Sequence, residues 1–183
     1  MSHTNQNGNA FETLGLEPRF DIDGGLLAER HRMLSGKLHP DRYSGRSASE
    51  RRMALDRAIQ VNEAYRQLRD PVRRAESLLS AKGVEVGEQK EPKASPALLM
   101  EMMEVRESLD EARRQKDLDR VGALSDEMRG REDAIMKRLS ATFSDAGDDP
   151  NQLEAALPIL GELRYVRRFF EELEAIEEAL MDA

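Results

Sequence analysis

The residues of this chain that could take part in chemistry are few, and two of them flank a proline. The tripeptide His39-Pro40-Asp41 offers an imidazole and a carboxylate, the side chains of an acid–base pair. The chain has three histidines, which also include His3 and His31, and it has no cysteine. A thiol nucleophile, disulfides and thiolate metal ligands are therefore excluded, and no two histidines have metal-ligand spacing. We predict neither a metal site nor a bound cofactor.

The surroundings of the tripeptide favour docking over catalysis. Side chains on either side of a proline, as in His39 and Asp41, rarely hydrogen-bond to each other. Catalytic pairs normally lie in a cleft, and this segment offers neither a nucleophile nor a concave wall. A rigid turn that presents a carboxylate and an imidazole is instead suited to contact with another protein. The alternative, from another functional class, is an enzyme that uses His39 and Asp41.

Three cations accompany this tripeptide. Arg30 and Lys37 are seven residues apart, which places them on one face of a helix, and Arg42 follows the tripeptide directly. Cations beside a docking loop steer an acidic partner toward it. The predicted partner-binding residues are His39, Pro40, Asp41, Arg30, Lys37 and Arg42.

A second candidate surface lies in the run from Leu98 to Glu111, which has more apolar residues than one buried helical face needs. At about 100° per residue, Leu98, Met102 and Val105 share one stripe, whereas a second apolar group falls on the other side with three glutamates. An apolar patch bordered by carboxylates is a candidate protein-binding surface, and a broad core face or a homodimer contact is the alternative. The second group consists of Leu99, Met100, Met103, Glu104, Glu107 and Glu111.

Two aromatic residues of the last helical pattern, Tyr165 and Phe169, lie one turn apart and off its predicted core stripe. The chain has only eight aromatic residues, three Tyr and five Phe, so this placement suggests a further contribution to a binding surface. We add Tyr165 to that surface. For Phe169, surface contact and internal packing stay open.

Helices must position these residues, and no segment has a convincing strand pattern. In the first half, a helix with one apolar stripe ends at Pro40, because proline lacks an N–H and disfavours a helical residue before it. A polar loop and a long third helix follow, and Asp70-Pro71 separates that helix from a fourth over 72–79. The stripe of the helix before Pro40 consists of Leu27, His31, Leu34 and Leu38.

The second half has three long amphipathic patterns, over about 97–114, 117–143 and 150–181. Short connections between long helices predict an antiparallel three-helix bundle. Pro158 lies inside the last pattern, where we expect it to kink the helix or to mark its true start.

Composition agrees with an all-α protein. Charged residues make up 35% of the chain and aromatic residues 4%, which is typical of helices with solvated faces. Residues 1–80 carry 13 Lys/Arg against 11 Asp/Glu, a balance of +2, and residues 81–183 carry 15 against 25, a balance of −10. This asymmetry indicates two domains with different partners, and the acidic half argues against nucleic acid. No apolar run approaches the roughly 20 residues that span a membrane, so we expect no membrane association.

The boundaries follow from local composition. Residues 83–96 contain two Gly and two Pro and have no helical period, which is typical of a linker. The first ten residues are polar and lack the regions of a secretory signal. The predicted organisation is a disordered tail over 1–9, a helical domain over 10–82, a linker over 83–96 and the bundle over 97–183.

The segment from Phe11 to Leu79 resembles a J-domain. The resemblance implies that the His-Pro-Asp loop and the basic helix dock on an HscA- or DnaK-type chaperone and stimulate its ATP hydrolysis. Two positions depart from the pattern: His31 occupies a core position, where we expect a packed neutral imidazole, and Gly36 weakens its helix by about 1 kcal/mol relative to Ala. The residues that carry the resemblance are Phe11-Glu12-Thr13-Leu14-Gly15-Leu16, His39-Pro40-Asp41-Arg42, Asn62-Glu63-Ala64-Tyr65-Arg66-Gln67-Leu68 and Asp70-Pro71-Val72-Arg73-Arg74.

The second half resembles the C-terminal bundle of the HscB-type co-chaperones. The residues that carry this resemblance are Leu99-Met100-Glu101, Arg106-Glu107-Ser108-Leu109-Asp110-Glu111 and Leu163-Arg164-Tyr165. It implies that the bundle binds an IscU-type scaffold, the protein on which iron–sulfur clusters are built. The residues that match the family's scaffold-contacting surface by position are Leu99, Met100, Met103, Glu104, Glu107, Glu111 and Tyr165.

These observations predict a two-domain, all-α co-chaperone that is not itself an enzyme and that delivers an IscU-type scaffold to the ATPase chaperone. ATP is then the partner's cofactor. Eukaryotic relatives carry a cysteine-rich zinc module, so the lack of cysteine suggests a bacterial, cytoplasmic protein. A J-domain co-chaperone with a different client protein is the rival interpretation.

Overall fold

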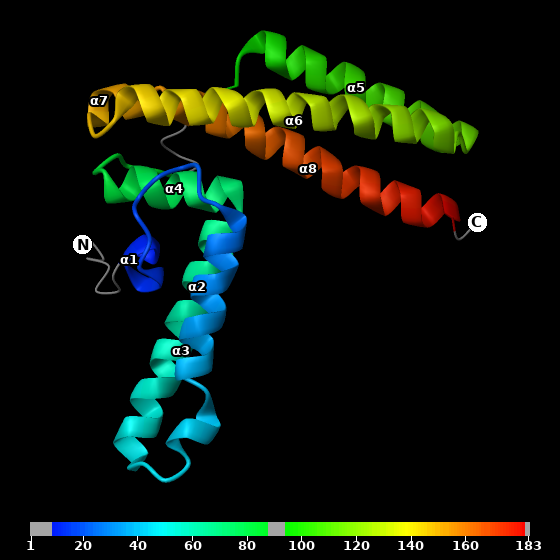
Figure 1. The fold of residues 1–183 in the computed structure, drawn as a ribbon. Coiled ribbons are helices and arrows are strands. Elements are labelled where there is room, and N and C mark those ends of the chain that lie inside the picture. Colours follow the sequence, from blue (N-terminus) through cyan, green and yellow to red (C-terminus); the bar gives the residue numbers. More distant parts are fainter. Residues whose placement is uncertain (1–8, 88–93, 182–183) are drawn as a thin grey trace. The chain divides into compact units, whose positions relative to one another are not determined.

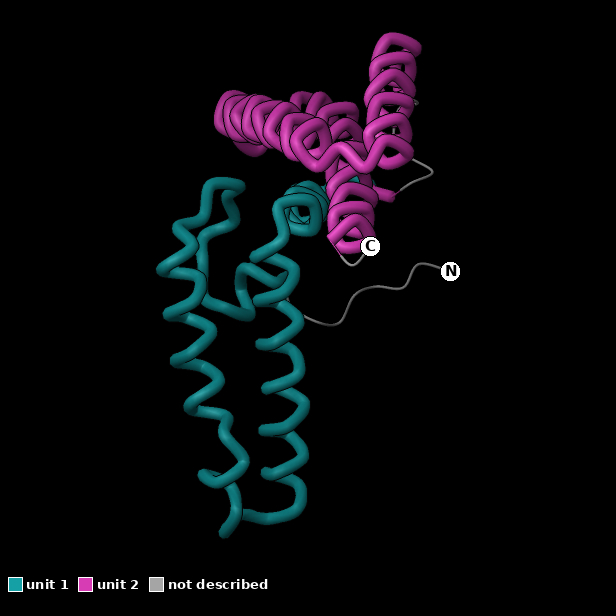
Figure 2. The backbone as a smooth tube through the Cα atoms, turned by 90° about the vertical axis from the view of Figure 1, so that its right-hand side faces the viewer, with its two compact units in different colours: residues 1–85 teal, residues 86–183 magenta. Residues whose placement is uncertain are grey.

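The computed structural model describes residues 9–87 and 94–181 of the chain. These residues form helices and no strand, which confirms the predicted all-α class. The backbone divides into two compact units, residues 1–85 and 86–183, shown in different colours in Figure 2. Most of the predicted tail, and residues 88–93 of the predicted linker, lie outside the described residues.

The first unit is a helical hairpin with two shorter helices at one end (Figure 1). Helices α2 (Gly24–Lys37) and α3 (Ala48–Arg69) form the hairpin, and a 3-10 helix, η1 (Pro40–Tyr43), lies in the turn between them. The short helix α1 (Ala10–Leu14) packs against α3. Helix α4 (Pro71–Ala81) follows α3 after a sharp break. The hairpin therefore carries the His-Pro-Asp tripeptide at its tip, away from α1 and α4.

Capping side chains set the ends of the two long helices. The Asp23 carboxylate accepts a hydrogen bond of 2.8 Å from the Leu26 N–H at the start of α2. Ser47 and Glu50 form a capping box at the start of α3, in which each side chain accepts from the other residue's backbone N–H. At the break, the Asp70 carboxylate accepts from the Arg73 N–H at 2.9 Å and so begins α4.

The core of the first unit lies mainly near α1 and α4. Of the predicted α2 stripe only Leu27 is buried, whereas His31, Leu34 and Leu38 are half-buried. The predicted stripe is therefore buried only in part, since α1 covers the hairpin only at the end remote from the tip. The buried apolar residues of this unit are Ala10, Phe11, Leu14, Phe20, Leu27, Ala54, Val61, Ala64, Leu68, Ala75, Leu78, Leu79 and Val84.

Arg74 ties the loop before α2 to α4. Its Nη1 donates a hydrogen bond of 3.0 Å to the Phe20 carbonyl, and its guanidinium lies 5.5 Å from the centroid of the Phe20 ring. Burial lowers the pKa of Arg74, and the carboxylates of Asp21 and Asp70 act in the opposite direction. These contacts fix the loop before α2 against α4.

The second unit is a bundle of three long helices, α5 (Pro96–Gln115), α6 (Leu118–Ala146) and α8 (Ala156–Met181). Helix α6 packs against both other long helices, and α5 also touches α8. A short helix, α7 (Pro150–Leu153), precedes α8. Pro158 therefore stands in the first turn of α8, where no backbone N–H is needed, and it marks the start of the helix, one of the two predicted outcomes.

The core stripes of α5 and α6 lie where the helical period predicts them, whereas the predicted stripe of α8 is only partly buried. Three members of that predicted stripe are half-buried, Phe170, Ile176 and Leu180, whereas Phe169, which lies outside it, is only 2% exposed. The whole predicted stripe consists of Ile159, Leu163, Val166, Phe170, Leu173, Ile176 and Leu180. Phe169 lies three residues before Glu172, which forms an ion pair with Arg106 of α5. Helix α8 therefore packs against α5 on this flank as well as against α6. Because two helices cover it, its buried face is wider than a single apolar stripe. The open interpretation of Phe169 is thus settled as internal packing.

The boundary between the units differs from the predicted linker. Val84 is 6% exposed, and its N–H donates to the Leu79 carbonyl at 2.9 Å, so the end of α4 and the following turn pack as one piece. At the other end, Pro96 is the first residue of α5, and the Ser95 side chain accepts from the Leu98 N–H. The connection is therefore shorter at both ends than the predicted 83–96.

Candidate protein-docking surfaces

The His-Pro-Asp loop is a tight turn held by its own backbone. His39 stands at the start of η1, and its carbonyl accepts from the Arg42 N–H at 3.0 Å. The Ser44 hydroxyl donates to the Asp41 carbonyl at 3.0 Å. Pro40 occupies the first position of η1, where its ring fixes the backbone dihedral that this turn needs. The loop is thus preformed.

The side chains of His39 and Asp41 lie close together, but no hydrogen bond joins them, because Nδ1 of His39 is the acceptor of a backbone N–H. Nδ1 of His39 lies 3.4 Å from Oδ2 of Asp41 and accepts a hydrogen bond of the same length from the Asp41 N–H. The 3-10 turn brings the two residues to one side of the loop. Both side chains remain open to solvent, the imidazole 59% and the carboxylate 89% exposed. Such a pair is available to a partner rather than enclosed around a substrate.

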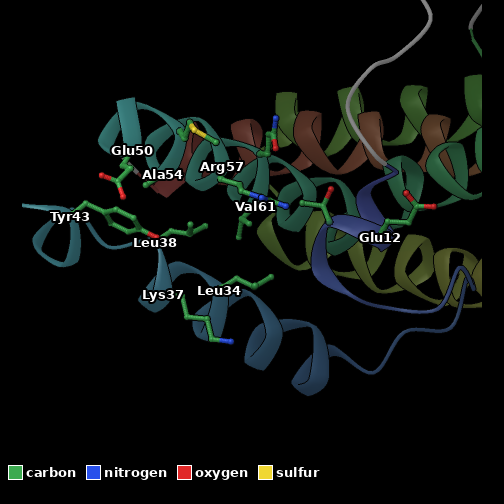
Figure 3. A pocket seen from close by; sticks show the side chains of 12 residues that line it. Glu12, Leu34, Lys37, Leu38, Tyr43, Glu50, Ala54, Arg57 and Val61 are labelled. Carbon is green, nitrogen blue, oxygen red and sulfur yellow. The ribbon is translucent and has the colours of Figure 1, made fainter. Parts of the chain in front are cut away.

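A groove of about 680 Å³ lies beside this loop, between α2 and α3 (Figure 3). Leu34 and Leu38 line it from α2, and Ala54 and Val61 line it from α3. Neither His39 nor Asp41 is among the residues that line the groove. The only imidazole–carboxylate pair between described side chains therefore lies outside this groove.

The three predicted cations differ in their exposure and in their distance along the chain from the loop. Lys37 and Arg42 are exposed and Arg30 is half-buried. Lys37 also lies at the edge of the groove, on α2 (Figure 3). None of the three forms an ion pair with another of the described residues, so their charges are available to an acidic partner.

His31 joins α2 to α3 about two helical turns before the loop. Its ring stacks on Tyr65 with centroids 4.2 Å apart and an interplanar angle of 18°. Its Nε2 lies 2.8 Å from Oδ1 of Asn62, and since a carbonyl oxygen only accepts, Nε2 donates. The imidazole does pack on a neighbour, but it is half-buried and not in the core position that the sequence predicts. Asn62 and Tyr65 emerge as residues that hold the hairpin. The sequence gives no signal of this contact, because it joins residues 31 positions apart.

Helix α5 has the two apolar faces that the sequence predicts. Leu98, Met102 and Val105 are buried, whereas Leu99 is 42%, Met100 64% and Met103 61% exposed. Of the ten large hydrophobic residues exposed in the described chain, these three lie close together on α5, as Met53, Leu55 and Ile59 do on α3. Methionine side chains are unbranched and polarizable, which suits an adaptable contact.

Tyr165, on the distant helix α8, lies on the flank of that helix that faces α5. Helices α5 and α8 run in the same direction, and Arg106 Nη2 of α5 lies 2.6 Å from Glu172 Oε1 of α8. Leu99 lies seven residues before Arg106, and Tyr165 lies seven residues before Glu172. Seven residues are two helical turns, so each residue is on the same face of its helix as the ion-pair member. Tyr165 is 36% exposed and so adds an aromatic edge on the flank of α8 that faces α5.

The three glutamates of the predicted face differ in their surroundings. Glu104, Glu107 and Glu111 are all exposed. Glu111 accepts a hydrogen bond of 3.0 Å from Gln115, one turn later, and neither Glu104 nor Glu107 is paired with any of the described cations. By contrast, Glu101 on another face of α5 accepts from Arg131 of α6, which lowers the pKa of Glu101 and links the two helices. The face thus carries uncompensated negative charge beside its apolar patch.

None of the helices within residues 9–87 and 94–181 is long and apolar enough to cross a membrane.

Known proteins resemble this chain along nearly its whole length. A family model described as "HSCB C-terminal oligomerisation domain" matches residues 94–174. A "Co-chaperone protein HscB homolog" of Shewanella sp. (strain ANA-3) is 34% identical over 175 residues, 95% of this chain and 99% of the relative. A protein of the same description in Vibrio vulnificus (strain CMCP6) is 35% identical over 172 residues, 94% of this chain and 98% of the relative.

Solved structures agree with these relatives. The chaperone HscB from Vibrio cholerae has a TM-score of 0.82 and 32% sequence identity, with 94% of this chain and 99% of that chain covered. Human co-chaperone HscB has the same TM-score at 24% identity, covers 96% of this chain and 85% of its own, and shows the shared fold. Relatives above 30% identity along both whole chains establish the family, and this chain belongs to the HscB co-chaperones.

Proposed function

We propose that this co-chaperone stimulates the ATPase of an HscA- or DnaK-type chaperone through its first unit and delivers an IscU-type scaffold protein to it through its second. The observation that carries the proposal is the presence of two separate exposed contact surfaces, one on each unit. The first is the loop with His39, Pro40 and Asp41 at the hairpin tip. The second is the apolar patch on the outer face of α5. The family relationship supports the same division of labour.

The proposed chaperone-binding surface works by contact rather than by catalysis. The Asp41 carboxylate is 89% exposed on a preformed turn, so binding requires little ordering of the loop. Unpaired cations beside it attract an acidic partner over about 10 Å at 0.1 M salt. The proposed contact residues are His39, Pro40, Asp41, Arg30, Lys37 and Arg42.

The proposed scaffold-binding surface combines apolar anchors with a charged rim. Removing an apolar anchor from such an interface typically costs about 1–3 kcal/mol of binding free energy, whereas rim charges contribute less. The unpaired Glu104 and Glu107 would contribute specificity and association rate. The proposed contact residues are Leu99, Met100, Met103, Glu104, Glu107, Glu111 and Tyr165.

One chain that holds both partners increases the local concentration of the client at the chaperone. A short tether between two binding sites gives effective concentrations of about a millimolar. Stimulation by this protein and by the scaffold together is therefore expected to exceed the sum of their separate effects. The likeness to bacterial co-chaperones suggests the cytoplasm as the place of action.

The decisive experiment measures ATP hydrolysis by the purified chaperone with the scaffold alone, with this protein alone, and with both. We expect a modest increase with this protein alone and a synergistic increase with both. No ATP turnover is expected from this protein without the chaperone. Turnover by this protein alone that is lost in His39→Gln would support the enzymatic alternative instead. Normal stimulation without synergy would point to a different client.

A further inference from the structure

The turn between α5 and α6 carries positive charge in an otherwise acidic unit. Residues 113–120 contain four exposed cations, Arg113, Arg114, Lys116 and Arg120, and two aspartates. One aspartate, Asp117, is engaged in capping α6 through the Arg120 N–H at 2.9 Å. None of the four cations forms an ion pair with any residue the structure describes. We refer to residues 113–120 as the basic tip.

Lys116 is held in a backbone conformation that usually requires glycine. It ends α5 with φ 55° and ψ 36°, in the left-handed region, and it is the one non-glycine residue with positive φ among the described residues. Glycine is the usual residue at such a helix end, because a Cβ strains this conformation. A lysine here adds charge at the expense of local stability. Strain of this kind is a reason to look for a binding role.

The basic tip continues the exposed face of α5. Met103, Glu107 and Arg114 follow one another at intervals of four and seven residues, which places them on one side of the helix. Met103 and Arg114 are eleven residues apart, or about 16 Å along the axis. The face therefore changes along its length from apolar, through acidic, to basic. At its end, Leu118 is 44% exposed among the cations.

We propose that the client-binding face extends from the apolar patch of α5 to the basic tip, and that the tip binds an acidic patch on the client protein. The inference rests on the proposed function, since it assumes that the client sits on Leu99, Met100 and Met103. Two charged zones of opposite sign along one axis admit a client in a single orientation, because the reversed orientation places like charges together. The tip is thus an orientation-determining element of the interface.

A protein partner fits this surface better than an anionic polymer or a lipid surface. The cations stand beside Glu107 and Glu111 on α5, and residues 81–183 together carry a balance of −10. Such surroundings repel a uniformly negative phosphate chain or membrane. A folded protein can present a local acidic patch to the tip and a basic patch to the glutamates.

Charge reversal at the tip tests the proposal. The double variant Arg114→Glu, Arg120→Glu should bind purified IscU-type scaffold at least about fivefold more weakly at 0.1 M salt, mainly through a slower association, and the difference should shrink at about 1 M salt. The matched control is Lys137→Glu, a reversal at an exposed position of α6 away from the tip, made together with Arg129→Glu to equal the charge change. The control should bind like the unchanged protein.

A second variant separates binding from folding. Lys116→Gly removes the charge and the backbone strain together, so it should raise or preserve the melting temperature while weakening scaffold binding. Lys116→Arg should keep the affinity. Affinity of Lys116→Gly equal to that of the unchanged protein, or weakening no greater than in the control, would overturn the proposal. The proposal would also be overturned if the unchanged protein bound anionic vesicles or duplex DNA and charge reversal at the tip left its scaffold affinity unaltered.

Failure of this inference is distinguishable from failure of the proposed function. If truncation of Leu99, Met100 and Met103 weakens scaffold binding but tip reversal does not, the client face ends before the tip. If neither variant weakens binding, the scaffold does not use α5 and the proposed function itself is wrong for this unit.

Discussion

At the scale of single residues, the loop around Pro40 depends on exposed groups that contribute little to packing. Among the described residues, the Asp41 carboxylate pairs with the imidazole of His39 alone, and both side chains are mostly solvent-exposed. Asp41→Asn keeps the shape of the side chain and removes its charge. We expect this variant to lose stimulation of the chaperone ATPase while its scaffold affinity and helix content stay unchanged. ATPase assays and far-UV circular dichroism on the same samples measure this.

His39→Gln is the companion variant and should give the same loss. Because His39 also accepts the Asp41 N–H at the start of η1, a small effect on the loop is expected, within about 0.5 kcal/mol for an exposed substitution. A melting temperature that falls in proportion to the lost stimulation in both variants would mean that the pair has a structural role.

Glu101 gives a pH-dependent prediction at the same scale. Its hydrogen bond from Arg131 lowers the pKa of the carboxyl in the folded state. A lowered folded pKa stabilises the bundle above the unfolded pKa, and this contribution is lost as the pH falls through the folded value. Glu101 is 53% exposed, so we expect Glu101→Gln to cost no more than about 0.5–1 kcal/mol at neutral pH.

The measurement is urea unfolding at about pH 7 and about pH 3, below the usual carboxyl pKa. The cost of Glu101→Gln should be present at neutral pH and should shrink in acid. Glu104→Gln, on the same helix but without a described ion pair, is the control and should cost less at neutral pH. A cost of Glu101→Gln that is the same at both pH values would contradict the assignment.

At the scale of helices, α2 carries part of the proposed docking surface and has a residue of low helix propensity. Gly36 stands in its last turn, and a Cβ placed there would meet nothing within 4 Å. Gly36→Ala should therefore stabilise the first unit by about 0.5–1 kcal/mol, through higher helix propensity. Thermal unfolding measures the gain. Stimulation of the chaperone should be unchanged, and a loss would show that docking requires flexibility in this turn.

The cations of α2 and its loop should make association with the chaperone dependent on salt. Lys37→Ala should lower the association rate more than it raises the dissociation rate, as rim charges usually do. The effect should disappear as the Debye length falls from about 10 Å at 0.1 M to about 3 Å at 1 M salt. Stopped-flow or surface-based kinetics would measure it, with Arg69→Ala at the far end of α3 as control. An association rate indifferent to salt would refute the electrostatic steering.

The same scale shows what a sequence can and cannot predict here. The buried stripe of α5 is predictable because burial follows a single helical period on this helix. Phe169 is not, since its burial depends on α8 having two neighbours. The contact between His39 and Asp41 depends on the dihedrals of a 3-10 turn, and the stack of His31 on Tyr65 joins two helices. Neither contact can be predicted from the spacing of residues along the sequence.

At the scale of the whole molecule, each unit is expected to keep its own function when the other is altered. The two units have separate cores, and the proposed contact residues of each lie outside that core. Variants on the outer face of α5 should therefore leave the chaperone-binding loop intact. The two activities can be separated within one full-length chain.

The combined variant Leu99→Ala, Met100→Ala, Met103→Ala makes this separation measurable. These side chains are 42–64% exposed, so their removal should leave the melting temperature nearly unchanged, whereas truncation of core residues costs about 2–5 kcal/mol of stability. Scaffold binding should weaken at least about tenfold, as loss of interface anchors predicts. The control is Leu98→Ala, which removes the neighbouring buried side chain and should lower the melting temperature.

In the chaperone ATPase assay, this triple variant should stimulate as well as the unchanged protein when no scaffold is present, and its synergy with scaffold should vanish. That pattern requires both surfaces to act as proposed, because a damaged first unit would lose the basal stimulation as well. Tyr165→Ala, on the other helix, should reduce the synergy in the same direction and by less, since Tyr165 is only 36% exposed. If the triple variant melts well below the unchanged protein, its three side chains support the bundle, and the client must bind elsewhere on the second unit.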